Sequence, residues 1–297
     1  MILEKIFSEY QNYLTIRKFR KKYKKNTAQR ILVSWLLNKE QIYLDEGMEI
    51  YKNIISVNLN SRASNEINLD KNLILSKLDN EKKFLIDLSL FNLHSRKGKK
   101  SLITQLQHSL STIRDFLFDT NLIIVGNLNL DFLGNNMVRL FKNIENISLE
   151  RYKAAILDPN GDLILNEDLL RFYDLFIIGG VVDVGLEWYK ATEYLFKDLN
   201  LPHVRIELDG SILGVPDRIN LLIKILLETY YLEIPLKDAI VKNQGKRDII
   251  KRFWYEIKKY SKNKEIKLED LDNILKNINI SREKMLYLLY KNNIKII

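Results

Sequence analysis

The sequence predicts an α/β protein in which a parallel sheet is flanked by a basic N-terminal domain and a small, basic helical C-terminal domain. Three observations support this prediction. Short apolar runs bounded by glycine or turn residues alternate with stretches whose apolar residues recur at helical spacing. Two of the runs, residues 175–183 and 204–219, carry glycines where a strand should end, which is where open α/β sheets bind ligands. Positive charge gathers towards both ends, so we expect domains at residues 1–82, 83–241 and 242–297.

The composition is that of a basic globular protein without thiol chemistry. The 297 residues include 47 Lys and Arg against 38 Asp and Glu, which gives a net charge of +9. Such a balance indicates a polyanionic partner, most commonly nucleic acid, although an ordinary basic enzyme would share it. The absence of cysteine excludes disulfides, cysteine-ligated zinc and thiol catalysis. His94, His108 and His203 are too scattered to indicate a metal site, so no metal is expected.

The hydropathy of the chain bears on its location. No run approaches the ~20 apolar residues that a membrane span needs, so no membrane partner is expected. The N-terminus has a short apolar patch but lacks the apolar core of a signal peptide. We therefore expect a cytoplasmic protein.

The N-terminal domain contains a dense basic segment. Eight cations and no acid fall between residues 17 and 30, namely Arg17, Lys18, Arg20, Lys21, Lys22, Lys24, Lys25 and Arg30. Tyr13, Phe19 and Tyr23 lie among or beside them. Cations at this density neutralise phosphates, and aromatic rings can stack on bases. We interpret the segment as an RNA-binding patch, with a solvated basic helix face as the alternative.

The central domain alternates strands and helices. Strands are expected at residues 84–91, 122–126, 154–157, 175–183 and 204–208. Helices are expected at residues 101–117, 131–146, 166–173, 186–199 and 216–232. Residues 94–100 hold several cations and Gly98, and we interpret them as a loop before the first of these helices.

Four glycines lie where the last two of these stretches pass from strand to loop: Gly179, Gly180, Gly210 and Gly214. Because they lack a Cβ atom, they permit unusual backbone angles and let a ligand touch the backbone. The pattern predicts a cofactor pocket walled by these loops, with Asp183 at its mouth. The alternative is that the glycines only turn the chain.

The composition shifts again at Lys242, where the C-terminal domain begins. Cations crowd a helix-like stretch that also holds Phe253, Trp254, Tyr255 and Tyr260. Two further short helices are expected, at residues 268–276 and 281–291. We interpret this region as a second basic face whose candidate RNA contacts are Lys246, Arg247, Lys251 and Arg252.

Three motifs of the central domain occur in an order known from one enzyme family. The first is FLIDLS followed by KSLITQL, at residues 84–89 and 100–106. The second is FIIGGVVD, at residues 176–183. The third is RIEL followed by ILGVPDRIN, at residues 205–208 and 212–220. Together they resemble the SPOUT-class methyltransferases that modify N1 of purine 9 in tRNA, and the resemblance covers roughly residues 84–235.

The resemblance implies a fold, a cofactor and a partner. The family fold is a parallel sheet with a C-terminal trefoil knot whose loops bind S-adenosylmethionine. Its members are thought to act as monomers, with accessory domains that grasp the tRNA. Carried over to this sequence, the cofactor-binding residues are Ile178, Gly179, Gly180, Val181, Val182, Leu208, Asp209, Gly210, Ile212, Leu213, Gly214 and Val215.

The implied reaction gives candidate roles to four polar residues: Asp183, Asp87, Asp217 and Gln105. Guanine N1 must lose a proton on methylation, for which a carboxylate base is useful. Adenine N1 instead develops a positive charge, which a carboxylate stabilises. Asp183 is the first candidate for either role, Asp87 and Asp217 are supporting acids, and Gln105 is a hydrogen-bonding partner of base or cofactor. Alternatively, Asp217 is a helix-start charge and Asp87 a buried acid that orients loops.

Two departures from the family pattern bear on the base. Eukaryotic members tend to have polar or basic residues after the loop aspartate, whereas Val184 and Gly185 follow it here. The C-terminal basic domain is also not expected in eukaryotic members. Both departures indicate an archaeal-type enzyme, and the first favours adenine over guanine. Two other functions stay open: a SPOUT methyltransferase acting on another RNA site, such as ribosomal RNA, and a non-catalytic RNA-binding protein.

Overall fold

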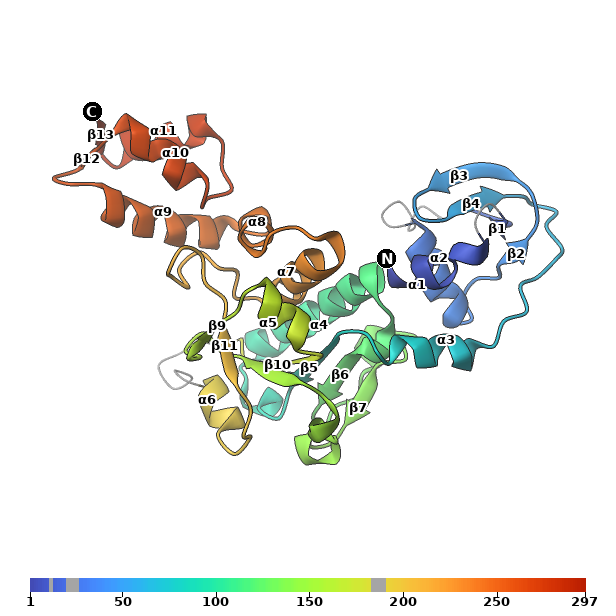
Figure 1. The fold of residues 1–297 in the computed structure, drawn as a ribbon. Helices are drawn as coiled ribbons and strands as arrows, with labels where there is room; N and C mark the ends of the chain where they lie inside the picture. The colour runs from blue at the N-terminus through green and yellow to red at the C-terminus, as the bar shows by residue number, and fades with distance from the viewer. Residues whose placement is uncertain (11–12, 20–26, 183–190) are drawn as a thin grey trace. The chain divides into compact units, whose positions relative to one another are not determined.

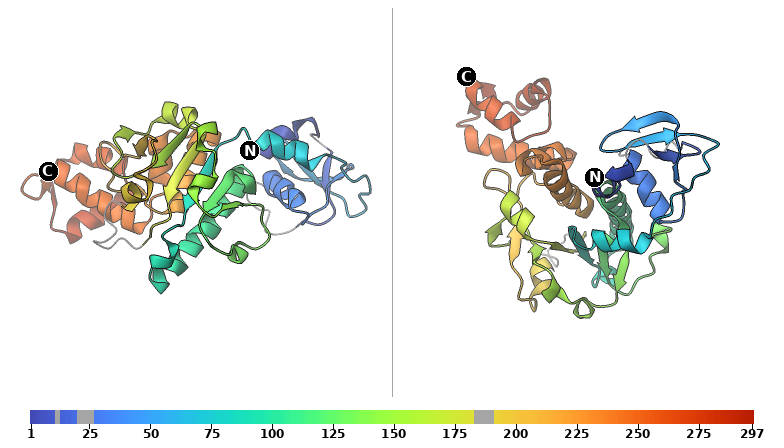
Figure 2. Two further views of the ribbon diagram at one scale, coloured as in Figure 1. Left: turned by 90° about the horizontal axis from the view of Figure 1, so that it is seen from below. Right: turned by 45° about the vertical axis from the view of Figure 1, so that its right-hand side comes forward.

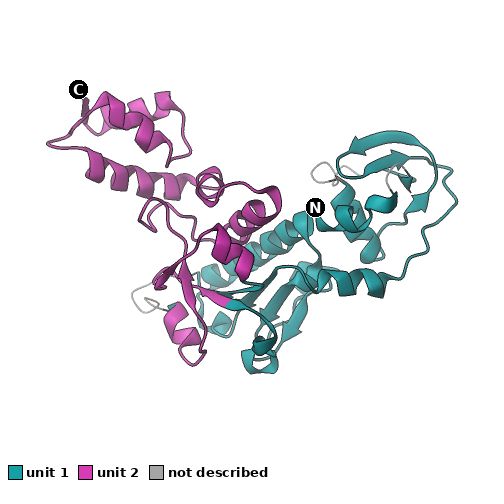
Figure 3. Ribbon diagram, viewed as in Figure 1, with its two compact units in different colours: residues 1–154, 173–191 teal, residues 155–172, 192–297 magenta. Residues whose placement is uncertain are grey.

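A computed structural model describes residues 1–10, 13–19, 27–182 and 191–297. The chain divides into two compact units, and each is formed by two segments of sequence (Figure 3). The first unit comprises residues 1–154 and 173–191, and the second comprises residues 155–172 and 192–297. Both units contain parallel strands between helices, so the predicted mostly parallel α/β sheet is confirmed. The three domains expected from the sequence stay a prediction.

The N-terminal part of the first unit folds around its own apolar core, which the sequence did not predict. Its helices and strands are α1 (Ile2–Ile6), β1 (Leu14–Ile16), α2 (Thr27–Leu36), β2 (Tyr43–Leu44), β3 (Met48–Lys52), β4 (Ser56–Leu59) and α3 (Lys71–Leu78) (Figure 1). The four strands form one sheet in the order β2-β1-β4-β3. Buried side chains of Phe7, Ile31, Trp35 and Val57 belong to the core beneath it.

The rest of the first unit contains the parallel strands that carry the first glycine segment. Its elements are β5 (Lys83–Asp87), α4 (Arg96–Phe116), β6 (Leu122–Val125), β7 (Arg139–Phe141) and β10 (Leu175–Gly179). These strands lie in the order β7-β6-β5-β10, and every neighbouring pair is parallel. All residues of β5 and β6 are buried, as expected for strands covered on both faces.

Two predictions for this part of the chain are wrong. Residues 131–146 do not form a helix, because a 3₁₀ turn (Asp131–Leu133) ends at Gly134 and Arg139–Phe141 pairs with β6 as an edge strand. Residues 94–100 are not all loop, because α4 already begins at Arg96. The hydroxyl of Ser95 accepts a hydrogen bond from the Gly98 amide at 3.0 Å and caps the helix.

The second unit holds the other parallel strands and the C-terminal helices. Its elements are β8 (Ala154–Leu157), β9 (Leu163–Ile164), α5 (Glu167–Phe172), α6 (Ala191–Phe196), β11 (His203–Arg205), α7 (Ile219–Leu232), α8 (Leu236–Lys242), α9 (Lys246–Tyr260), β12 (Glu265–Ile266), α10 (Leu268–Leu275), α11 (Arg282–Lys291) and β13 (Lys295–Ile296). Strand β11 pairs in parallel with both β8 and β9. Helices α9, α10 and α11 lie side by side (Figures 1 and 2) and share a core that includes Phe253, Leu271 and Leu289.

In the described ranges, no helix combines the length and the apolar character that crossing a membrane requires.

Candidate functional site

The first glycine segment is held by the backbone of the neighbouring strand. Gly179 lies opposite Asp87 in the parallel pairing of β10 with β5. The next residue, Gly180, donates its amide hydrogen to the carbonyl oxygen of Asp87 at 2.7 Å. A Cβ atom at Gly180 would lie only 2.5 Å from that carbonyl oxygen and 2.5 Å from Leu88 Cδ2. Glycine is therefore required here by close approach, while its neighbours Val181 and Val182 remain half-buried.

His94 supports the end of this segment, a role that the sequence did not reveal. Its imidazole is buried at 4% exposure, and Nε2 accepts a hydrogen bond from the Val182 amide at 3.3 Å. Because a backbone amide can only donate, Nδ1 carries the ring proton and donates to the Leu90 carbonyl at 3.0 Å. The histidine thus links the segment after β10 to the turn after β5.

Two of the predicted polar site residues are buried in this unit. Asp87 is 4% exposed, and its Oδ1 accepts a hydrogen bond from the Ser89 amide at 2.7 Å. Gln105 is 7% exposed on α4, where Nε2 lies 3.5 Å from the Ser101 hydroxyl one turn earlier. Asp87 therefore shapes the turn that Gly180 contacts, which agrees with the alternative of an acid that orients loops. Asp183 lies outside the described residues.

The second glycine segment, residues 208–215, is a tight loop in the second unit. Leu208 and Ser211 exchange backbone hydrogen bonds, at 2.8 Å and 3.3 Å. Asp209 and Gly210 both have positive φ angles, of 46° and 76°, and so reverse the chain. Beyond this turn, Ile212 and Leu213 are 41% and 44% exposed. The loop therefore presents two apolar side chains on a sharply bent backbone.

Asp209 fastens the start of this loop to helix α8. Both of its carboxylate oxygens lie 3.0 Å from Lys237 Nζ. Burial opposes the charged form, but hydrogen bonds from Lys237 and Asn277 and the charges of Lys237 and Arg252 together hold the pKa of Asp209 below its usual value. The carboxylate is therefore ionised near neutral pH and available for the Lys237 contact.

The end of the loop packs against helix α9. Arg252 is fully buried, and its Nη1 donates to the carbonyl oxygens of Leu208 at 2.5 Å and Leu213 at 3.2 Å. Gly214 has a φ angle of 90°, and a Cβ atom there would lie 2.4 Å from Arg252 Cβ. Gln244 Nε2 donates to the Gly214 carbonyl at 3.0 Å. A single surface of the C-terminal helical region thus contacts both ends of the loop.

The burial of Arg252 corrects one sequence prediction. We expected its guanidinium on the basic outer face of the C-terminal domain, as an RNA contact, but it is directed into the protein. The other three candidates on this helix, Lys246, Arg247 and Lys251, are exposed. Lys251 Nζ lies 3.3 Å from Asp217 Oδ2 in an exposed ion pair, so Asp217 already has a cationic partner. Asp217 precedes α7 rather than standing in its first turn.

The N-terminal basic patch is only partly described. Arg20, Lys21, Lys22, Lys24 and Lys25 lie outside the described residues. The guanidinium of Arg17 lies 4.4 Å from the ring centroid of Tyr43, and its Nε donates to the Ala63 carbonyl at 2.7 Å. Lys18 is exposed. Arg30 Nε lies 2.6 Å from Asp115 Oδ1. The described part therefore includes two arginines engaged with other residues of the chain and one exposed lysine.

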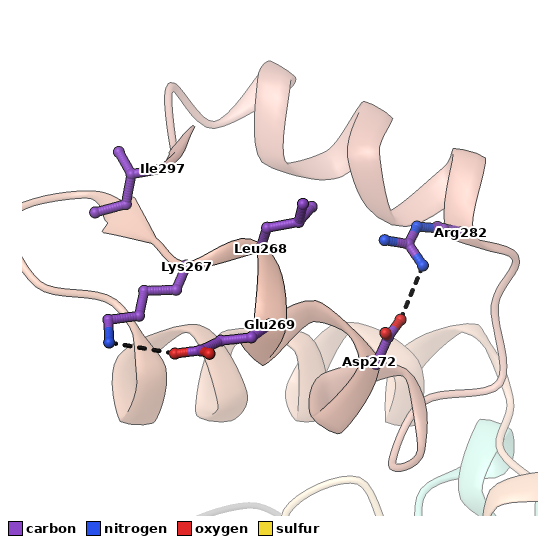
Figure 4. Close-up of a pocket in the computed structure, with 6 residues that line it drawn as sticks. All are labelled: Lys267, Leu268, Glu269, Asp272, Arg282 and Ile297. Atoms are coloured by element: carbon purple, nitrogen blue, oxygen red, sulfur yellow. Dashed lines mark hydrogen bonds and ion pairs between the residues drawn. The ribbon is translucent and has the colours of Figure 1, made fainter.

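One described hollow lies in the C-terminal region but away from the predicted cofactor residues. It has a volume of about 660 Å³ and is lined by Lys267, Leu268, Glu269, Asp272, Arg282 and Ile297 (Figure 4). Acids and bases pair beside it, with Lys267 3.2 Å from Glu269 and Arg282 2.9 Å from Asp272 (Figure 4). Its mixed charge gives it no preference for a polyanion.

Comparisons with known proteins agree with the motifs. No family model matches the chain. Residues of this chain are 37% identical over 181 positions to a tRNA (adenine(9)-N1)-methyltransferase of Sulfolobus acidocaldarius, a match that covers 60% of each protein. They are 26% identical over 172 positions to a tRNA (guanine(9)-/adenine(9)-N1)-methyltransferase of Thermococcus kodakarensis, covering 49% of this chain and 42% of the relative. The chain thus matches less than two thirds of the length of these curated relatives.

Solved structures extend the likeness to nearly the whole chain. The crystal structure of Sulfolobus acidocaldarius Trm10 in complex with S-adenosylhomocysteine is similar with a TM-score of 0.72 at 25% identity, and the match covers 98% of both chains. A second structure of that protein, at 2.1 Å resolution, gives a TM-score of 0.59 at 28% identity over 82% of this chain and 98% of the other. The resemblance of this chain to the SPOUT-class tRNA purine-9 N1-methyltransferases, predicted from its motifs, is therefore confirmed in sequence and in fold.

Proposed function

We propose that this protein methylates N1 of the purine at position 9 of tRNA with S-adenosylmethionine as methyl donor, and that it prefers adenine to guanine. The observation that carries the proposal is the 37% identity over 181 residues to a relative named for adenine-9 methylation. A second relative is named for both purines. Adenine is therefore the target that the two names share.

The glycine loops fit a cofactor that is bound largely through backbone atoms. Gly180 and Gly214 let the two segments pack closely on Asp87 and Arg252, whereas nothing lies within 4 Å of the Cβ position of Gly210, which leaves that backbone open to a ligand. The exposed Ile212 and Leu213 offer apolar surface for a purine or a thioether chain. We assign residues 178–182 and 208–215 to the cofactor on these grounds. When bound, S-adenosylmethionine supplies an electrophilic methyl group on sulfur.

The contribution of the chain to methyl transfer is mainly positioning. The N1 lone pair of the base must be held in line with the bond to the methyl group, and fixing that geometry lowers the barrier by several kcal/mol. Asp183 stands one residue beyond the segment that His94 and Asp87 hold. We assign it to the target base, where its carboxylate stabilises the cationic adenine product or accepts the guanine N1 proton. Asp217 is a weaker candidate because Lys251 neutralises it.

The basic residues at both ends of the chain suit a tRNA partner. The target base must leave its stack before N1 can be reached, so we expect the protein to grip the tRNA through its phosphates. Lys246, Arg247 and Lys251 are exposed on α9. Trp254, which is 47% exposed on the same helix, could stack on a base or ribose. The trefoil knot, the monomeric state and the cytoplasmic location stay part of this proposal.

The test is a methylation assay on tRNA transcripts that carry A9, G9, C9 or U9, with the product mapped by mass spectrometry. Methyl at N1 of A9, with less or none at G9, is the expected result. Methylation at another tRNA position, or of ribosomal RNA only, would show that the proposed target is wrong but that the protein is an RNA methyltransferase. Calorimetry that finds no S-adenosylhomocysteine binding would favour a non-catalytic RNA-binding protein.

A further inference from the structure

Helix α9 carries a fully buried arginine that pairs with a glutamate one turn later and also reaches a loop outside the helix. Arg252 and Glu256 are both fully buried, and Nη2 of the arginine lies 2.5 Å from Oε1 of the glutamate. All the other lysines and arginines on this helix are exposed. A buried charge is tolerated only where it is paired and hydrogen-bonded. The presence of an arginine at this buried position therefore cannot be explained by solubility or by RNA contact.

Net stability does not explain this ion pair. Removing two charges from water offsets most of their attraction, so a buried ion pair is often no better than an apolar pair of the same size. Here Arg252 Nε and Glu256 Oε2 lack a hydrogen-bond partner among the described residues, and Nη2 meets Glu256 as an ion pair without hydrogen-bond geometry. An apolar pair would leave no such atoms. We therefore look for the role of the pair in the hydrogen bonds that the guanidinium makes through Nη1.

One nitrogen of the guanidinium, Nη1, serves the 208–215 loop. Nη1 reaches the carbonyl oxygens of both Leu208 and Leu213, which stand at opposite ends of the exposed bend. A planar guanidinium is suited to this task because its geometry is fixed and it presents several donors in one plane. One side chain thereby sets the distance between the two ends of the loop.

Three further polar residues, Glu256, Gln244 and Asn277, form a polar network with Arg252 and the same loop. Glu256 Oε1 accepts a hydrogen bond from Asn277 Nδ2 at 2.9 Å. Gln244 Nε2 donates to the Asn277 carbonyl at 3.0 Å as well as to the Gly214 carbonyl at 3.0 Å. Glu256 therefore orients Arg252, while Gln244 holds the loop and Asn277 joins the two. This network is built entirely of residues downstream of the motifs that resemble the family.

We propose that Arg252 is a positioning residue for the cofactor loop, so that the C-terminal helical region forms part of the cofactor site in addition to contacting RNA. The ligand is S-adenosylmethionine, and in that respect the proposal rests on the proposed function. The positioning of the loop itself does not depend on the identity of the ligand.

The experiment replaces the ion pair by apolar side chains of similar size. The double variant Arg252→Met/Glu256→Met removes the donors without leaving an uncompensated charge. Arg252→Lys is a second variant that keeps the charge but has no planar fork. Lys258→Met, at an exposed position of the same helix, is the matched control for a lost cation. All are made in the full chain and checked for folding by circular dichroism and thermal unfolding.

Two measurements are made on each variant. Hydrogen–deuterium exchange of residues 208–215 without ligand should be about tenfold faster in the double variant, intermediate in Arg252→Lys and unchanged in Lys258→Met. The dissociation constant of S-adenosylhomocysteine should rise about tenfold, within the range usual for coupled sites. In turnover, KM for S-adenosylmethionine should rise, while kcat at saturation stays within a few fold of wild type.

The outcomes separate the two proposals. Loop exchange and S-adenosylhomocysteine affinity both within twofold of wild type, in a folded double variant, would overturn the positioning role. If the double variant does not fold, the same result in Arg252→Lys would overturn it. Failure of the wild-type protein to bind S-adenosylhomocysteine would count against the proposed function, while the exchange experiment would still decide whether Arg252 holds the loop.

Discussion

The two glycine segments are held by different means. The segment after β10 is fixed by its neighbour in the sheet, since Gly180 bonds directly to the backbone of Asp87. The loop at residues 208–215 is fixed by side chains, with Arg252, Gln244 and Lys237 all reaching it from the C-terminal helices. A loop held by strand pairing is as rigid as the sheet. A loop held by side chains depends on the C-terminal helical region, which can change without a change in the loop itself.

Suppose that the first segment contributes to the reaction and the second mainly binds the cofactor. Substitutions of the acids that follow them, Asp183 and Asp217, should then differ most in their effect on the methylation rate. Asp183→Asn should lower the single-turnover methylation rate by about 10²-fold or more, the usual contribution of a positioned acid or base. Cofactor affinity should stay within a few fold. Asp217→Asn is the matched variant and should lower the rate much less, because Lys251 already pairs with Asp217. An Asp183→Asn rate equal to wild type at every pH would remove Asp183 from the mechanism.

Substituting the two glycines should sharpen the comparison in stability. Gly180→Ala places Cβ 2.5 Å from a sheet carbonyl that cannot move, so denaturant unfolding should show a loss of about 3 kcal/mol. Gly214→Ala should act more locally, raising the S-adenosylhomocysteine dissociation constant more than it lowers the free energy of unfolding. Gly210→Ala is the control for backbone angle, because its φ is 76° but nothing lies within 4 Å of its Cβ position. Equal stability of Gly180→Ala and Gly210→Ala would contradict the distinction.

Two groups, one just before β5 and one in the second loop, should respond to pH on opposite sides of neutrality. Beside β5, burial lowers the pKa of Lys82 to about 8, only partly offset by the charges of Asp174 and Glu81. Between pH 8 and about 10.5 the unfolded chain holds this proton and the folded chain does not, so stability rises with pH across that window. The free energy of unfolding of wild type relative to Lys82→Met should therefore increase by on the order of 2 kcal/mol.

Urea unfolding at several pH values between 7 and 11 measures this difference, with Lys97→Met as the control for an exposed lysine. A flat difference between wild type and Lys82→Met would show that the buried amine is not desolvated. Near the second loop stability also rises with pH, because the pKa of Asp209 is lowered too, but the window lies in the acid range. The lowered pKa of Asp209 means that its contribution is present at neutral pH and is lost as pH falls through the acid range below about 4. The protection factors of the loop amides should therefore fall in acid before the sheet unfolds.

Substitutions in the two basic segments should have the smallest effect, a weakening of tRNA binding. Each end of the chain should contribute part of it. Replacing Lys21, Lys22, Lys24 and Lys25 together by alanine should weaken tRNA binding by about tenfold and flatten its salt dependence. Replacing Lys246 and Arg247 tests the exposed face of α9 in the same way, with a change in salt slope of about one for each lost phosphate contact. An unaltered affinity and salt slope in either set would identify that segment as a solvated face.

The sequence predicted best what local pattern determines. Strands β5, β6, β8 and β10 were expected close to where they lie, because uninterrupted apolar runs between turn residues have few other uses. The helix expected at residues 131–146 was wrong, since its apolar residues suit a helix until Gly134 and the following Asn135 and Asn136 break it. The N-terminal sheet was missed because its strands are short, with only three residues in β1.

The site shows the same division. Gly180 and Asp87 could be singled out because the motif and the strand ends place them. The role of His94 could not be predicted, because no local pattern signals a contact with an amide 88 positions away. Arg252 was assigned to RNA because an arginine in a basic helix is nearly always exposed. Only tertiary structure shows that its donors are directed to a loop about 40 residues upstream.

The burial of Arg252 also bears on whether the C-terminal region can be exchanged as a module. An RNA-binding appendage that touched only its ligand could be deleted or replaced by recombination without consequence for the catalytic core. Here, ending the chain before Gln244 would remove that residue and Arg252 together, so three carbonyl groups of the loop would lose their donors. We therefore expect the loop and the buried face of the helix to be retained together in evolution, even where the residues on the outer face of the helix change.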